Sequence, residues 1–237
     1  MPYAHLLLDL QTPIATLTLN RPDKRNALSA EMMREIIHAL RAVGDSDARG
    51  LILAAQGPVF SAGHSFADMA GQDLEHLRAL FELCTTMMNT LQALPQPVIA
   101  KVHALATAAG CQLVATCDLA LAADSASFAI PGGKASLFCH TPLVAVARNI
   151  GRKRAMEMAL TGDTIDAATA ADWGLVNRAV PAAQLDAATL DLISRASRGC
   201  AVSKAMGKQG YYQQIDLPQP EAYAVSGERM SQGAARE

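Results

Sequence analysis

The chain has 237 residues, of which 51% are hydrophobic and 4% aromatic, and its formal net charge is −2. This composition is that of a globular protein, and its scattered Lys and Arg residues form no basic stripe for nucleic acid. No run of about 18 apolar residues is present, so no segment is expected to span a membrane. Because the N-terminus lacks the charged start and long apolar stretch of a signal peptide, we expect a cytoplasmic protein.

The five cysteines are expected to be thiols of a reducing compartment. They form no CxxC pair and no paired spacing with histidine, so neither disulfides nor a metal site is predicted. They are Cys84, Cys111, Cys117, Cys139 and Cys200.

Strands and helices alternate in the first part of the chain, and helices dominate the last part. Alternating apolar residues predict strands at 5–11 and 14–20, joined by a turn at Thr12 and Pro13. Next come a polar loop at 21–26, a helix with Ser29 as N-cap and Leu28 to Val43 at helical spacing, a buried strand at 50–55, a loop at 56–69 and a helix at 74–94. The stretch 98–124 reads as strand, small-residue turn, short helix and strand, followed by a strand at 127–130 and a turn at 131–134. Helices are predicted at 141–150, 153–160, 167–173, 182–197, 200–213 and 221–231, with one strand at 175–180.

A repeated unit organises this order. Three times, a strand leads through a turn rich in small residues towards a helix, which predicts an α/β spiral of strand–strand–helix units. We expect a spiral core over 1–180 and a helical cap over 181–237. The polar segment after Gly227 is expected to fray or to be a truncated end.

The stretch 98–124 also carries a candidate binding feature. Small residues at Ala108, Ala109 and Gly110 allow close backbone approach, and a helix starting there offers unpaired N–H groups and the positive end of a dipole. Such a helix start suits an anion, or a carbonyl oxygen that becomes anionic during a reaction. The alternative is that the small residues only allow tight helix–sheet packing.

Four groups of residues together resemble the crotonase family, also called the enoyl-CoA hydratase/isomerase family. They are Leu19-Asn20-Arg21-Pro22 with Asn26-Ala27-Leu28; Phe60-Ser61-Ala62-Gly63; Pro97-Val98-Ile99-Ala100 through Cys117-Asp118; and Leu160-Thr161-Gly162-Asp163 through Gly174-Leu175-Val176. They occur in the family's order and cover most of the chain. The motifs ATAAGCQLVA and LFCxTP match one branch of that family.

The resemblance implies a crotonase-like fold of ββα units, assembled as a trimer or a dimer of trimers, and acyl-CoA thioesters of fatty acid metabolism as ligands. It also implies an oxyanion hole made by the backbone N–H groups of His64 and Ala109. Coenzyme A enters as part of the substrate, and no further cofactor is implied. The residues implied in its binding are Lys24, Arg25, Ala27, Ala62 and His64. As an alternative, Lys24 and Arg25 are plain solvated loop charges.

The sequence departs from the family's hydratases at the acid/base pair. The two glutamates that activate water and protonate the substrate fall on Gln112 and Gly132, and neither residue can transfer a proton. Ser65 replaces the usual Asp of the oxyanion loop. We therefore expect an enzyme of the hydratase/isomerase family, a lyase or isomerase, in which ordinary hydration is weak or absent.

Other residues are candidates for proton transfer. His140 is the first, because some isomerases and dehalogenases of the family place a carboxylate near this point and histidine titrates near neutral pH. The alternative is that His140 caps a helix or lies exposed on a loop. His64 is the second candidate, although its backbone is expected to matter more than its ring. Cys139 beside His140 suggests a thiol–imidazole pair, although the side chains of adjacent residues seldom point at each other. Asp68 and Asp73 either face the acyl pocket or stabilise the start of the helix at 74.

Two further functions stay open. Gly63-His64-Ser65-Phe66-Ala67 approximates the G-x-S-x-G elbow of serine hydrolases, with Ser65 as nucleophile, but the preceding strand ends well before it. The other is a non-catalytic protein that binds acyl-CoA on a scaffold without its catalytic residues.

Overall fold

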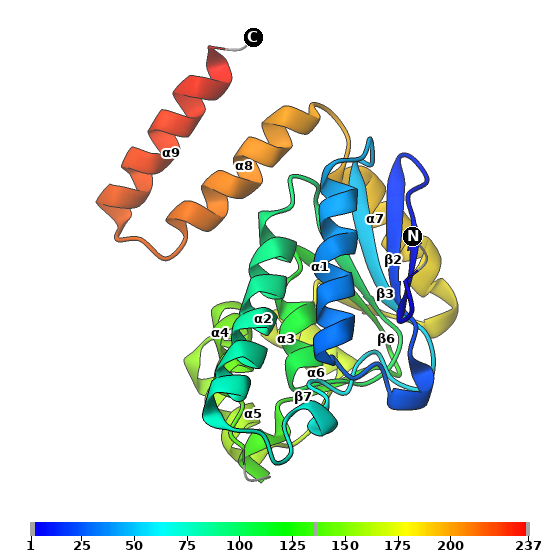
Figure 1. Ribbon diagram of the computed structural model, residues 1–237. Helices are drawn as coiled ribbons and strands as arrows, with labels where there is room; N and C mark the ends of the chain where they lie inside the picture. The colour runs from blue at the N-terminus through cyan, green and yellow to red at the C-terminus, as the bar shows by residue number, and fades with distance from the viewer. Residues whose placement is uncertain (1–2, 135–136, 236–237) are drawn as a thin grey trace.

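The computed structural model describes residues 3–134 and 137–235 and shows the mixed α/β architecture that the sequence predicts (Figure 1). The strands are β1 Leu6–Asp9, β2 Ile14–Leu19, β3 Gly50–Ala55, β4 Val98–Val102, β5 Ala106–Thr107, β6 Leu119–Ala123, β7 Ser127–Ala129, β8 Ile165–Asp166 and β9 Arg178–Val180. The α-helices are α1 Ala30–Gly44, α2 Leu74–Ala93, α3 Ala109–Thr116, α4 His140–Ile150, α5 Arg152–Thr161, α6 Ala167–Trp173, α7 Leu185–Ala196, α8 Ala201–Gln214 and α9 Gln219–Ala234.

The larger sheet has the strand order β1-β2-β3-β4-β6-β9. The first two strands form the predicted antiparallel hairpin, and every later neighbour is parallel. Figure 1 shows α1 and α7 on opposite sides of this sheet. Because both faces are covered, β3 and β6 are almost continuously buried, which explains their unbroken apolar sequences.

A second, smaller layer of strands connects the large sheet to the helices. It contains β5, β7 and β8, and isolated bridges from Leu28 to His64 and from Ser61 to Ala106 extend it. Four strands of the large sheet, β2, β3, β4 and β6, each lead through this layer to one helix, α1 to α4 in turn. This is the predicted spiral of strand–strand–helix units.

Element boundaries follow local chemistry. The Ser29 side chain accepts a hydrogen bond from the Met32 N–H and caps α1, as predicted. The strand predicted at 175–180 is shorter, because Gly174 has a φ of +91° and ends α6, and the Leu175 N–H then donates back to the Ala170 carbonyl. The sequence prediction missed β8, which has only two residues.

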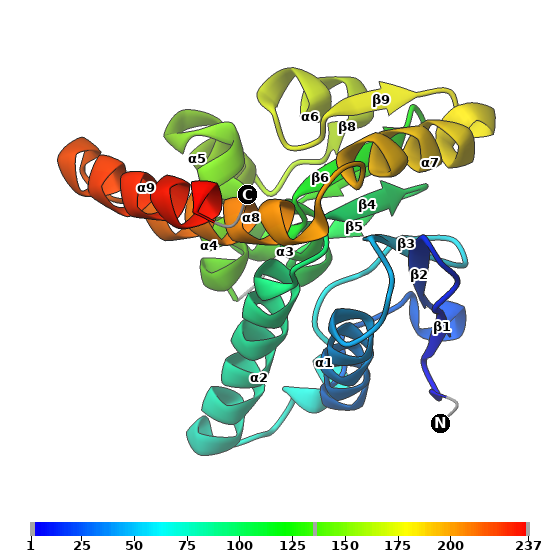
Figure 2. The same ribbon diagram turned by 90° about the horizontal axis from the view of Figure 1, so that it is seen from above.

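The last two helices form a hairpin that projects from the body of the molecule (Figure 1; seen from above in Figure 2). Helix α8 is attached to the body by Asp118, which forms an ion pair with Lys208 Nζ at 2.7 Å and accepts a hydrogen bond from the Tyr212 hydroxyl at 2.8 Å. Helix α9 buries none of its residues and continues to Ala234, so the fraying predicted after Gly227 is wrong. Helix α7 instead packs on the sheet through Ile193, which is fully buried. The division into 1–180 and 181–237 stays a prediction.

All five cysteines lie in the described residues and are free thiols. Four of them are buried and Cys200 is exposed. Of the helices that the structure describes, none combines the length and the apolar character needed to cross a membrane.

Candidate active site at the start of α3

Two loops meet at the N-terminus of α3 because a glycine allows it. Gly63 has a φ of +83°, and a Cβ added to it would lie 2.9 Å from the Thr107 carbonyl oxygen and 3.0 Å from the Ala109 nitrogen. An added Cβ on Gly110 would lie 2.5 Å from the Ser61 carbonyl oxygen. All three distances are shorter than ordinary contacts, so the packing requires glycine at both positions. The structure thus shows tight packing of the small residues at the start of α3, and the binding feature predicted there stays a prediction.

A buried asparagine holds the first of these loops in position. Asn26 Nδ2 donates to the Gln56 and Val59 carbonyls at 2.7 and 3.1 Å, and its Oδ1 accepts from the Arg21 N–H at 2.8 Å. Asn26 is fully buried and has a φ of +49°, a conformation that asparagine tolerates better than most residues. In the sequence, Asn26 stands out only as part of the Asn26-Ala27-Leu28 motif, and its position after a Pro-containing loop is the signal for its role.

The backbone N–H groups of His64 and Ala109 have no hydrogen-bond partner among residues 3–134 and 137–235. In the parallel bridge between Leu28 and His64, the Leu28 N–H donates to the Gly63 carbonyl and the Ser65 N–H donates to the Leu28 carbonyl. The His64 N–H takes no part in either hydrogen bond. Ala109 is the first residue of α3, and its N-cap, Ala108, offers no capping side chain. An uncapped helix start with unpaired donors favours negative charge.

Both residues line one cavity of about 560 Å³. Much of its wall is apolar, and this part is contributed by Phe66, Met69, Phe81, Leu137, Phe138 and Pro142. Of the predicted site residues, Ala62, His64, Ala109, Gly132 and His140 line it, whereas Gln112, Lys24, Arg25 and Ala27 do not. No Asp or Glu occurs among the described residues of the wall.

The His64 ring forms part of this wall. It lies edge-to-face against Phe81, with ring centroids 5.2 Å apart, and its Nε2 is buried with no partner among the described residues. Burial lowers the pKa of His64 to about 4, and the nearby Asp68 carboxylate offsets only part of this effect. The imidazole is therefore neutral at physiological pH, and the ring is poorly suited to accept a proton.

Gln112 and Gly132 occupy different environments. Gln112 is buried in α3, and its Oε1 has no partner within the described part of the chain. An added Cβ on Gly132 would lie 2.2 Å from the Leu137 carbonyl oxygen, 2.7 Å from the Cys139 nitrogen and 2.8 Å from Cys139 Sγ. Gly132, the position expected to correspond to the second hydratase glutamate, thus has no room for a side chain, because Leu137 and Cys139 fill the space.

His140 lies exposed at the first residue of α4 and lines the same cavity. Its backbone N–H donates to the Phe138 carbonyl, and its ring is tilted against Phe138 with centroids 5.1 Å apart. The neighbouring Cys139 thiol is buried, and burial raises its pKa above the ordinary value. A thiol in that state is a weak nucleophile, which argues against a reactive Cys139–His140 pair.

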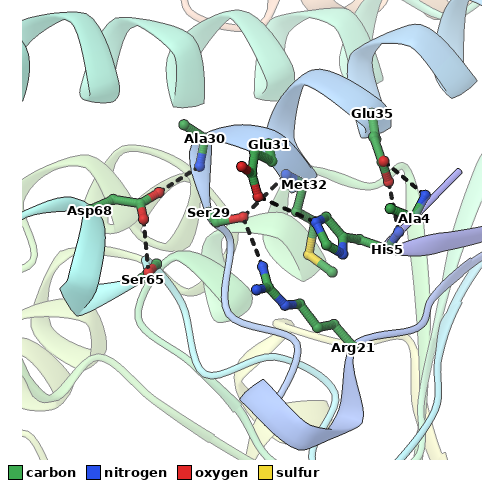
Figure 3. Close-up of polar contacts among 10 residues, drawn as sticks. All are labelled: Ala4, His5, Arg21, Ser29, Ala30, Glu31, Met32, Glu35, Ser65 and Asp68. Atoms are coloured by element: carbon green, nitrogen blue, oxygen red, sulfur yellow. Dashed lines mark hydrogen bonds and ion pairs between the residues drawn. The ribbon is translucent and has the colours of Figure 1, made fainter.

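Ser65 and Asp68 serve the loop rather than a catalytic triad (Figure 3). The Ser65 hydroxyl donates to Asp68 Oδ1 at 3.1 Å, and Asp68 Oδ2 accepts from the Ala30 N–H at 2.7 Å. Asp68 therefore stabilises the start of α1, while Asp73 is the N-cap of α2. Strand β3 ends at Ala55, so Ser65 does not stand on a strand-to-helix elbow.

The loop proposed for coenzyme A lies next to the cavity. The Arg25 carbonyl accepts a hydrogen bond from the Ala62 N–H at 3.0 Å, and Ala62 lines the cavity. Lys24 and Arg25 are exposed and form no ion pair with another described residue. Within the described chain, no group of three or more His, Cys, Asp or Glu side chains could hold a metal ion.

A family model described as "Enoyl-CoA hydratase/isomerase" matches residues 9–234. The chain belongs to the enoyl-CoA hydratase/isomerase family. In this family, the chain is 38% identical to the mitochondrial enoyl-CoA hydratase domain-containing protein 3 of Mus musculus, over 93% of this chain and 74% of the relative. It is 35% identical to a probable enoyl-CoA hydratase of Mycobacterium leprae, over 83% and 79% of the two chains.

Solved structures confirm the crotonase-like fold. The human enoyl coenzyme A hydratase domain-containing protein 3 superposes with a TM-score of 0.94 at 37% identity, covering 98% of this chain and 92% of the other. An enoyl-CoA hydratase of Mycobacterium smegmatis has the same TM-score at 43% identity, covering 98% and 91%. The resemblance predicted from the motifs, to the enoyl-CoA hydratase domain-containing protein 3 branch, is confirmed. Its members are named mitochondrial, which does not fit the predicted cytoplasmic location.

Proposed function

We propose that this protein binds acyl-CoA thioesters and stabilises the thioester enolate between the backbone N–H groups of His64 and Ala109. The observation that carries the proposal is the pair of N–H groups without described partners on one cavity, brought together where Gly63 meets α3. Two such donors suit an oxygen that gains negative charge, and removing one typically costs about 2.7–4 kcal/mol of transition-state stabilisation. The adjoining loop with Lys24, Arg25 and Ala27 is the proposed contact for coenzyme A.

Ordinary hydration of an enoyl thioester is not the proposed reaction. Gln112 cannot exchange a proton at neutral pH, and Gly132 has no space for a carboxylate. His140 is the candidate acid or base, because its imidazole lines the cavity and can donate or accept a proton. The reaction proposed is therefore an isomerase- or lyase-type proton transfer next to a stabilised thioester.

A non-catalytic acyl-CoA-binding protein is the second candidate. It is favoured by the absence of a carboxylate among the described cavity residues and by the exposure of His140, whose ring lies against Phe138. The serine hydrolase alternative receives no support from the Ser65 hydroxyl, which donates to Asp68. The predicted trimer or dimer of trimers stays a prediction.

One comparison separates the candidates. Wild type and His140→Ala are tested against enoyl-, dienoyl- and β-hydroxyacyl-CoA thioesters, with coenzyme A binding measured by calorimetry on the same samples. Turnover that is lost in His140→Ala while binding persists supports the enzyme. Binding without turnover of any thioester supports the non-catalytic protein, and absence of binding refutes both.

A further inference from the structure

A second cavity, of about 370 Å³, lies at the opposite end of the strands from the candidate active site. Two residues of its wall, Arg49 and Pro97, directly precede β3 and β4, whereas the loops of the candidate active site follow these strands. The wall is completed by Ser197, which follows α7, and by Ala201, the first residue of α8. No described residue lines both cavities, so this one is a separate place for a small molecule.

Two cations of this wall have no acidic partner. Arg49 donates from Nε and Nη2 to the Ser197 carbonyl at 3.3 and 3.2 Å, and from Nη2 to the Gly199 carbonyl. These carbonyl oxygens accept hydrogen bonds but carry no net charge, so the guanidinium charge stays unbalanced. Neither Arg49 nor the half-buried Lys204 forms an ion pair with another described residue. The wall also contains Asp47, which is exposed, so positive charge is in excess among its described residues.

Helix α8 begins at this wall without a capping side chain. Its N-cap, Cys200, makes no side-chain hydrogen bond to the helix, and the N–H groups of Ala201, Val202 and Ser203 have no partner in the described parts of the chain. Ala201 and Val202 line the cavity together with Arg49. Unpaired N–H groups, the positive end of the helix dipole and two cations in one wall favour an anion.

A buried glutamine of the same wall lacks a hydrogen-bond donor. Gln96 lines the cavity and is only 7% exposed. Its Nε2 donates to the Val43 and Ala48 carbonyls at 3.0 and 3.2 Å, which places Oε1 on the other side of the amide group. Oε1 accepts no hydrogen bond from the described residues. Because a buried acceptor without a donor is costly, the anion that suits this wall also brings an O–H group.

From this arrangement we infer that the cavity binds a phosphate group that carries a hydroxyl or lies next to one. The phosphate oxygens accept hydrogen bonds from Arg49, Lys204 and the first N–H groups of α8, and the hydroxyl donates to Gln96 Oε1. Protonated inorganic phosphate is the smallest ligand of this kind, and the phosphate monoester of a hydroxylated small molecule is the larger one. Sulfate has a similar shape but no proton at neutral pH, so it leaves Gln96 Oε1 unpaired. The inference does not depend on the proposed function.

The test is calorimetric titration of the wild-type protein with inorganic phosphate, sulfate and glycerol 3-phosphate, in a phosphate-free buffer near neutral pH. Phosphate is expected to bind at least about tenfold more tightly than sulfate, because only phosphate supplies the missing donor. Tighter binding of glycerol 3-phosphate than of inorganic phosphate identifies a phosphate monoester as the ligand. The reverse order identifies inorganic phosphate.

A charge reversal at the wall provides the matched variants. Lys204→Glu should weaken phosphate binding at least about tenfold, because it removes a cation and adds an anion. Lys153→Glu makes the same change at an exposed lysine of α5, outside this cavity, and should leave the affinity unchanged. Circular dichroism verifies the fold of each variant, and Lys204→Gln, which removes the cation without adding an anion, should weaken binding to a smaller extent.

Three results would overturn the inference. They are no binding of phosphate or glycerol 3-phosphate at millimolar concentrations, equal affinity of the wild-type protein for phosphate and sulfate, and equal phosphate affinity of the folded Lys204→Glu and Lys153→Glu variants. The first two use only the wild-type protein, so they hold even if a variant fails to fold.

Discussion

Gly132, the residue expected at the position of the second hydratase glutamate, offers a test of whether the fold has room for a side chain there. A methyl group added there meets the Leu137 carbonyl oxygen at 2.2 Å and the Cys139 nitrogen at 2.7 Å. Both are backbone atoms, so neither can rotate away, and the loop before α4 must shift to accommodate the change. Gly132→Ala is therefore expected to destabilise the fold although it adds only one carbon.

The magnitude follows from the cost of overpacking. Inserting a methyl group into a filled site costs about 1–3 kcal/mol. For a chain of this size, each kcal/mol lowers the melting temperature by about 2–4 °C. Gly132→Ala should therefore melt roughly 2–12 °C below wild type in a thermal scan followed by circular dichroism.

Gly227→Ala is the matched control. Gly227 lies within α9 and has no atom within 4 Å of an added Cβ, so alanine should be neutral or stabilising by up to about 1 kcal/mol.

An activity assay tests the same crowding. A Gln112→Glu/Gly132→Glu double variant should not hydrate crotonyl-CoA, because the second carboxylate has no space. A Gly132→Ala protein as stable as wild type, or a folded double variant with hydratase activity, would refute this reasoning.

Two further predictions concern buried polar groups. Asp118→Asn should lower the unfolding free energy in urea by about 3 kcal/mol, because Lys208 and Asp118 are only 10% and 16% exposed and the ammonium would lose its charged partner. Tyr212→Phe removes one hydrogen bond and should cost about 1 kcal/mol. Equal losses of unfolding free energy in the two variants would contradict this account. Burial lowers the pKa of His64 from 6.5 to about 4, so the unfolded chain binds a proton between these values that the folded chain does not. The stability contributed by the neutral ring is present above pH 6.5 and is lost as the pH falls towards 4, by roughly 3 kcal/mol in total. His64→Leu should flatten this part of the pH profile of the unfolding free energy, and a wild-type slope that persists in the variant would show that other groups cause it.

The order of elements was predictable because it depends on local patterns. Alternating apolar residues marked β2, an uninterrupted apolar run marked β3, and Ser29 marked the start of α1. The motif at Ala108 to Gly110 located one side of the candidate site, because a helix start with small residues can be recognised from the sequence. Boundaries were missed where tertiary contacts determine them, as at β8, whose two residues form a strand only by pairing with β7.

The pairing of distant groups was decided by the tertiary structure alone. The sequence shows Gly63 and Ala109 as separate small-residue positions, and only the folded chain brings them into contact, through a glycine with positive φ. Sequence also shows that Gly132 lacks a carboxylate, but not that the Leu137 carbonyl and Cys139 leave no room for one. Local patterns determine which segments become strands and helices, because each depends on neighbours along the chain. The cavity, its largely apolar wall and the crowded Gly132 depend on atoms far apart in sequence, and close packing of the folded chain determines them.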